Sequence, residues 1–102
     1  QEFGSEQTLR TVCARFLQEL KQQMATIEQA WNQHDWETMA REAHRIKGGA
    51  GSLEAVPLAM AAGQLEIALK AEQFERVETA LAQLEKKVQE ITNYHQTCFQ
   101  NE

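Results

Sequence analysis

The sequence predicts an all-α protein, an antiparallel up-down four-helix bundle. In four successive stretches of the chain, apolar residues recur at steps of three and four, which is the period of one helix face. Alanine, glutamine, glutamate and leucine are abundant, and all are good or fair helix formers. The chain has one proline, and the stretches are joined by short connections, so consecutive helices should pack side by side in opposite directions.

The first helix is expected over residues 6–31. Its apolar face combines large aliphatic and aromatic side chains: Leu9, Val12, Cys13, Phe16, Leu17, Leu20, Met24, Ile27 and Trp31. Residues 1–5 show no such period, and we interpret them as a cloning remnant or a linker outside the fold. The remaining residues, 6–102, are short enough to form a single domain.

The other three helices are expected over residues 35–51, 56–70 and 74–98. Asp35 follows a short connection and can cap the second helix, because its carboxylate can accept bonds from free backbone N–H groups. Pro57 suits the first turn of the third helix, where a missing N–H costs nothing. The alanines and Gly63 of that helix should allow close packing against the second helix. The fourth helix has an apolar seam with alternating steps of three and four, on which His95 lies.

Composition excludes several classes of protein. The net charge of −5 argues against a nucleic-acid binder, which would usually carry a basic stripe. No run approaches 18 apolar residues, so no membrane span or direct membrane contact is expected. We also expect the domain to be a monomer. The three histidines lack zinc-ligand spacing, so no metal site is expected.

The two cysteines, Cys13 and Cys98, are best interpreted as small apolar residues on helix faces. The start of the first helix and the end of the last lie at the same end of an up-down bundle, so a bridge between them is sterically conceivable. A cytosolic protein would keep such a pair reduced.

A histidine on the second helix is the candidate functional residue. His44 lies away from the apolar stripe of its helix, so its imidazole should point out of the core. At about 100° per residue, three later residues fall within about 60° of it: Lys47, Gly48 and Gly51. Ala40 and Arg41 lie on the same side, and we expect this face, with Arg45, Gly48 and Gly51, to contact a partner. Glu37 also lies there and could either orient the ring or repel a phosphate.

This arrangement suits phosphoryl transfer to the imidazole. Neutral imidazole is a nucleophile near pH 7, because its unperturbed pKa is about 6.5. Lys47 could neutralise the negative charge that a phosphoryl group brings, and the bare backbone at Gly48 and Gly51 would let a partner approach closely. Arg41 and Arg45 are either general surface charge or contacts to an acidic partner, and the sequence leaves both interpretations open. No set of base and orienting group for hydrolase chemistry and no phosphate-binding loop is present, so ATP binding is not expected.

Ala43-His44-Arg45-Ile46-Lys47-Gly48, followed by Ala50-Gly51-Ser52-Leu53, resembles the signature of histidine-containing phosphotransfer (HPt) domains of two-component signalling. The flanks Ala30–Trp36 and Ala62–Glu66 are similar as well, and Glu54 departs from the small residue that many members carry. The resemblance implies that His44 accepts a phosphoryl group from an aspartyl phosphate of one receiver domain and passes it to another receiver.

The same resemblance implies that the domain needs no cofactor of its own, since the Mg²⁺ would sit on the receiver. It would have no kinase activity, and it would work in the cytoplasm, free or tethered as part of a hybrid sensor histidine kinase. The alternative is a helical adapter or a phosphorylation-incompetent module that binds a receiver without accepting phosphate.

Overall fold

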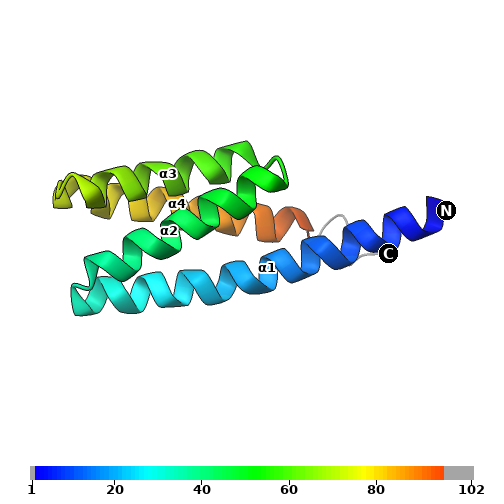
Figure 1. The fold of residues 1–102 in the computed structure, drawn as a ribbon, viewed down its shortest axis with the longest axis horizontal. Coiled ribbons are helices and arrows are strands. Elements are labelled where there is room, and N and C mark those ends of the chain that lie inside the picture. The colour runs from blue at the N-terminus through cyan, green and yellow to red at the C-terminus, as the bar shows by residue number, and fades with distance from the viewer. Residues whose placement is uncertain (1, 96–102) are drawn as a thin grey trace.

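The computed structural model describes residues 2–95, with side chains from Arg10 to Tyr94, and folds as four helices (Figure 1). They are α1 (Glu2–Gln33), α2 (Trp36–Ser52), α3 (Val56–Lys70) and α4 (Phe74–His95). No strand occurs within residues 2–95. The prediction of an all-α four-helix bundle is confirmed.

The largest difference between the observed and predicted helix bounds is at the start of the chain, and α1 also ends two residues later than predicted, at Gln33. The third helix begins and ends where predicted, and the second is displaced by one residue. α1 begins at Glu2 rather than at residue 6, and its N-terminal part projects beyond the other three helices (Figure 1). An existing helix can extend by one hydrogen bond per residue without an apolar face, so periodicity did not reveal this extension. The predicted end of the fourth helix at residue 98, the side chain of His95 and Cys98 lie outside the described residues. Cys13 is half-buried and free.

All four helices contribute to one apolar core. The largest fully buried side chains are aliphatic and come two from each helix: Leu20, Ile27, Met39, Ile46, Leu58, Leu65, Val77 and Leu84. Burial of each such side chain contributes about 1.5–3 kcal/mol relative to exposure. α2 therefore has a fixed orientation, with one face in the core and the other free for chemistry.

The helix ends carry the local signals expected from the sequence. Asp35 caps α2, since its carboxylate accepts the Thr38 N–H at 3.2 Å and the Thr38 hydroxyl at 2.7 Å. These hydrogen bonds hold the pKa of Asp35 below its ordinary value. Pro57 lies in the first turn of α3. The break between α3 and α4 is closed by Glu72 in the left-handed conformation, with φ of 56°.

Aromatic side chains join the two turns at one end of the bundle, where α1 meets α2 and α3 meets α4 (Figure 1). Trp36 lies at the centre of this cluster, with ring centroids 5.7 Å from Trp31 and 4.9 Å from Phe74. His34 stacks on Trp36 at 5.3 Å and is otherwise exposed. His34 therefore has a structural position in the turn between α1 and α2.

Two adjacent glycines of α2 face different surroundings and should respond differently to alanine. A Cβ at Gly48 would meet nothing within 4 Å, whereas a Cβ at Gly49 would lie 3.3 Å from Cε1 of Phe16 on α1. We expect Gly48→Ala to raise the free energy of unfolding by about 0.5–1 kcal/mol. Gly49→Ala should raise the free energy of unfolding by less than this, or lower it, because the Phe16 ring must move to make room for the new Cβ. Urea unfolding of both variants measures the difference, and equal gains would contradict the tight α1–α2 contact.

A carboxyl pair between α1 and α4 predicts a pH-dependent stability. Partial burial and a hydrogen bond to Glu28 raise the pKa of Glu85. Between the ordinary pKa of a glutamate and the raised pKa of Glu85, the folded state binds more protons than the unfolded state. The free energy of unfolding therefore falls as the pH rises through this interval. We expect Glu85→Gln to stabilise the bundle at pH 7 by about 0.3–0.5 kcal/mol, the size typical of exposed charge pairs.

The measurement is urea unfolding of the wild type and Glu85→Gln from pH 8 to about 5, with Glu78→Gln, an exposed glutamate on the same helix, as the control. The advantage of Glu85→Gln should shrink as the pH falls. A constant difference between the two proteins would show that Glu28 and Glu85 do not share a proton.

Candidate functional site

His44 lies on the exposed face of α2, opposite the buried residues Met39, Ala43, Ile46 and Ala50. Its side chain is 69% exposed, which agrees with the orientation predicted from the helical period. The imidazole is thus available to a partner while its helix is held by the core.

A buried carboxylate on α3 holds one nitrogen of this imidazole. His44 Nδ1 lies 3.1 Å from Oε2 and 3.3 Å from Oε1 of Glu66, whose side chain is only 8% exposed. The two residues meet because α2 and α3 pack along each other, and their interface is the most extensive one between described helices. No other described residue forms a hydrogen bond to the ring, so Nε2 has no partner among the described residues.

Sequence reasoning missed Glu66 and considered Glu37 instead. Glu37 is exposed and makes no hydrogen bond or ion pair with His44. A signal was available, because Glu66 and Lys70 are the only charged residues of α3, whose other side chains are apolar apart from Gln64, and they lie one turn apart. Charges in such a helix are expected to be paired.

Lys70 completes the group, with Nζ 2.9 Å from Oε2 of Glu66. The hydrogen bond from Lys70 lowers the pKa of Glu66, burial opposes this by raising it, and the hydrogen bond with His44 adds to the lowering. The net effect keeps the carboxyl ionised. An ionised carboxylate can only accept hydrogen bonds, so the Nδ1 that it holds carries the proton. In the neutral ring the lone pair is then on Nε2.

A shallow hollow of about 320 Å³ lies beside the imidazole, and it is lined by Ala40, Arg41, His44, Arg45, Glu66 and Lys70. Three of the residues predicted to contact a partner, Ala40, Arg41 and Arg45, are therefore at its wall. Arg45 pairs with Glu42 at 3.3 Å, and Arg41 donates to the Thr38 hydroxyl at 3.4 Å. The hollow is rich in cationic side chains that an anionic group could meet.

Lys47, Gly48 and Gly51 lie on α2 but do not line this hollow. Lys47 is exposed, and its Cδ would lie 3.6 Å from a Cβ at Gly63, so its stem passes over α3 at that glycine. No side chain comes within 4 Å of a Cβ built at Gly48 or Gly51. The helix surface at these two glycines is therefore open.

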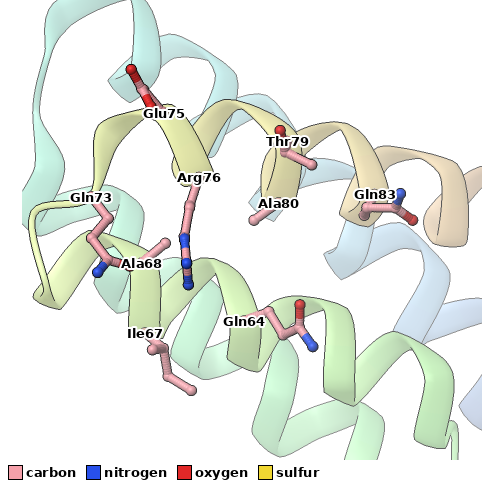
Figure 2. A pocket seen from close by; sticks show the side chains of 9 residues that line it. All are labelled: Gln64, Ile67, Ala68, Gln73, Glu75, Arg76, Thr79, Ala80 and Gln83. Atoms are coloured by element: carbon pink, nitrogen blue, oxygen red, sulfur yellow. The ribbon is translucent and has the colours of Figure 1, made fainter.

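A second, larger hollow of about 640 Å³ lies between α3 and α4 (Figure 2). The Arg76 side chain extends from α4 toward α3 between Gln73 and Gln64, and Glu75 and Thr79 also line the hollow. It contains no histidine or cysteine. Among the described residues no group of three His, Cys, Asp or Glu side chains could hold a metal ion. No described helix is both long and apolar enough to cross a membrane.

Comparison with known proteins assigns the chain to a family. The model of the Hpt domain matches residues 11–94, which is most of the chain and includes all of α2 and α3. Searches of curated proteins and of solved structures returned no match. Hpt domains are phosphocarriers rather than kinases, and they interact with receiver domains in two-component signalling. The matched region, with its exposed histidine on a four-helix bundle, shows that this chain belongs to the HPt family.

Proposed function

We propose that His44 is the phosphoacceptor of a phosphorelay, which takes a phosphoryl group from the aspartyl phosphate of one receiver domain and passes it to an aspartate of another. The observation that carries the proposal is the contact between Nδ1 of the exposed His44 side chain and the ionised Glu66, because this contact places the lone pair of a neutral ring on Nε2. Of the ring nitrogens of His34 and His44, only those of His44 have an acidic side chain as a partner.

In the proposed step, the lone pair of Nε2 attacks the phosphorus of the aspartyl phosphate. The P–N bond forms as the P–O bond to the aspartate breaks, and the aspartate leaves as a carboxylate. The positive charge that develops on the ring is compensated by Glu66 through the Nδ1 proton, which stays on the ring throughout. The second transfer is the reverse reaction with a different aspartate, so this domain needs no other proton acceptor.

The surroundings of His44 fit a reaction that depends mainly on in-line positioning and charge neutralisation. Lys47 would stand beside the incoming phosphoryl group, and Arg41 and Arg45 would face the partner. The exposed backbone at Gly48 and Gly51 would allow the receiver to approach. The receiver is expected to bring the Mg²⁺ and the phosphorylated aspartate, so the domain itself supplies a nucleophile and a docking face.

The test is transfer from a receiver labelled with radioactive phosphate to the purified domain. We expect label on the domain that is labile to acid and stable to base, as phosphohistidine is, and that is discharged by an unlabelled second receiver. A domain that binds the phosphorylated receiver without becoming labelled would contradict the proposal and identify the adapter instead.

The role of Lys47 gives a separate prediction. Lys47→Ala should slow transfer by roughly 10-fold while the bundle stays folded, because the lysine is exposed and its charge is needed only beside the phosphoryl group. Rapid-quench measurement of the transfer rate checks this, with Lys21→Ala on α1 as an exposed control. Equal rates for the two variants would remove Lys47 from the site.

A further inference from the structure

One oxygen of Glu66 has two partners. Oε2 lies 2.9 Å from Lys70 Nζ and 3.1 Å from His44 Nδ1. The carboxylate is 8% exposed, whereas the side chains of Lys70 and His44 are 68% and 69% exposed. The buried negative charge therefore lies between two exposed side chains, of which one is a permanent cation and the other can gain a proton.

A buried carboxylate without another cation would favour the imidazolium form of a neighbouring histidine. An imidazolium carries protons on both nitrogens, so Nε2 would have no lone pair for attack on phosphorus. A carboxylate already compensated by an ammonium group holds the Nδ1 proton by a hydrogen bond but attracts a second ring proton less.

Lys70 is the cation placed to do this. From α2, the charged groups that face Glu66 across the hollow are Arg41 and Arg45, besides His44. Arg45 pairs with Glu42, and Arg41 donates to Thr38. From α3 the charged neighbour is Lys70, and no other described cation forms an ion pair with Glu66.

We propose that Lys70 is a positioning residue for the transfer reaction, which acts through Oε2 of Glu66 to keep the His44 ring neutral and its Nε2 unprotonated at neutral pH. This inference rests on the proposed function of His44 and adds a residue on α3 to the machinery. The structure gives Lys70 an ion pair with Glu66 and no hydrogen bond to the His44 ring.

The test is an NMR titration of the His44 ring protons in the wild type, Lys70→Met and Lys70→Arg. We expect the midpoint of Lys70→Met to move up by about half a pH unit, and that of Lys70→Arg to stay near the wild type because the charge is kept. The control is Lys87→Met, which removes the lysine of another exposed ion pair, 3.3 Å from Glu90 on α4, and should leave the midpoint unchanged. An unchanged midpoint in Lys70→Met would overturn the proposal.

A second titration tests whether Lys70 acts on His44 through the Glu66 carboxylate. In a Glu66→Gln background, adding Lys70→Met should have no further effect on the midpoint of the His44 titration. A shift of equal size in that background would show that Lys70 acts on the ring directly and would overturn the routing. The acid side of the pH–rate profile for transfer should move with the midpoint, which corresponds to a loss of up to about threefold at a given acidic pH.

The NMR titration does not depend on phosphorylation. Phosphate label that survives replacement of His44 would contradict its role as phosphoacceptor, and the effect of Lys70 on the titration midpoint would still stand. A normal transfer assay combined with an unmoved midpoint would end only the role of Lys70.

Discussion

Replacement of His44 by glutamine should reduce acceptance of phosphate from a receiver to background. Glutamine has a similar length and polarity but no nucleophilic nitrogen. The native side chain is 69% exposed and its ring makes a hydrogen bond only to Glu66, so the bundle should remain folded. Transfer from a labelled receiver measures the loss, and circular dichroism with urea unfolding shows that the fold is intact.

The matched control is His34→Asn. His34 is exposed in the turn between α1 and α2 with φ of 59°, a conformation that asparagine tolerates better than most residues. This variant should be labelled as well as the wild type. Label that survives in His44→Gln would place the acceptor elsewhere and contradict the account of the site.

Removal of Glu66 should have the second largest effect. We expect Glu66→Ala to slow transfer by roughly 10- to 100-fold, the loss typical of removing a carboxylate that orients a functional histidine. Glu66→Gln should cost less, because an amide oxygen can still accept the Nδ1 proton although it lacks the charge. Rapid-quench rates with saturating receiver separate this loss from a loss of binding.

The control for Glu66 is Glu42→Gln. Glu42 is the other buried carboxylate, with 8% residue exposure, and it pairs with Arg45 rather than with the imidazole. It should slow transfer much less than Glu66→Ala. Equal losses in the two variants would mean that burial of an acid, rather than its contact with His44, matters.

The lowered pKa of Glu66 also predicts how its contribution to stability depends on pH. Because the pKa of Glu66 is lower in the folded state than in the unfolded state, its ionised carboxylate stabilises the fold at pH values above the unfolded-state pKa. This contribution is lost as the pH falls through the folded-state pKa. The stability difference between wild type and Glu66→Gln should therefore be present at pH 7 and decline below about pH 4.5. Urea unfolding at both ends of this range tests the sign.

The helices were predictable because their signals are local. The apolar period marks each buried face, Asp35 and Pro57 mark two helix starts, and all three appear in the structure as expected. The start of α1 at Glu2 was not predictable in this way. Helix propagation adds one hydrogen bond per residue and does not require an apolar period, and residues 1–5 show none in the sequence.

The site was predictable only as far as one helix determines it. The exposure of His44 follows from its angle on α2, and so does the open helix surface beside it at Gly48 and Gly51. The contact with Glu66 depends on the axial register of α3 against α2, which the period of either helix does not specify. That register also carries the stem of Lys47 over Gly63 and brings Lys70 to the site instead.

If Glu66 fixes the ring through Nδ1, then Nε2 of His44 is the acceptor. Phosphorus–nitrogen correlation NMR on the domain, labelled with nitrogen-15 histidine and phosphorylated by a receiver, identifies the phosphorylated nitrogen. Phosphorus should couple to Nε2 of His44 while Nδ1 keeps its proton. Coupling to Nδ1, or to a nitrogen of another histidine, would contradict this assignment.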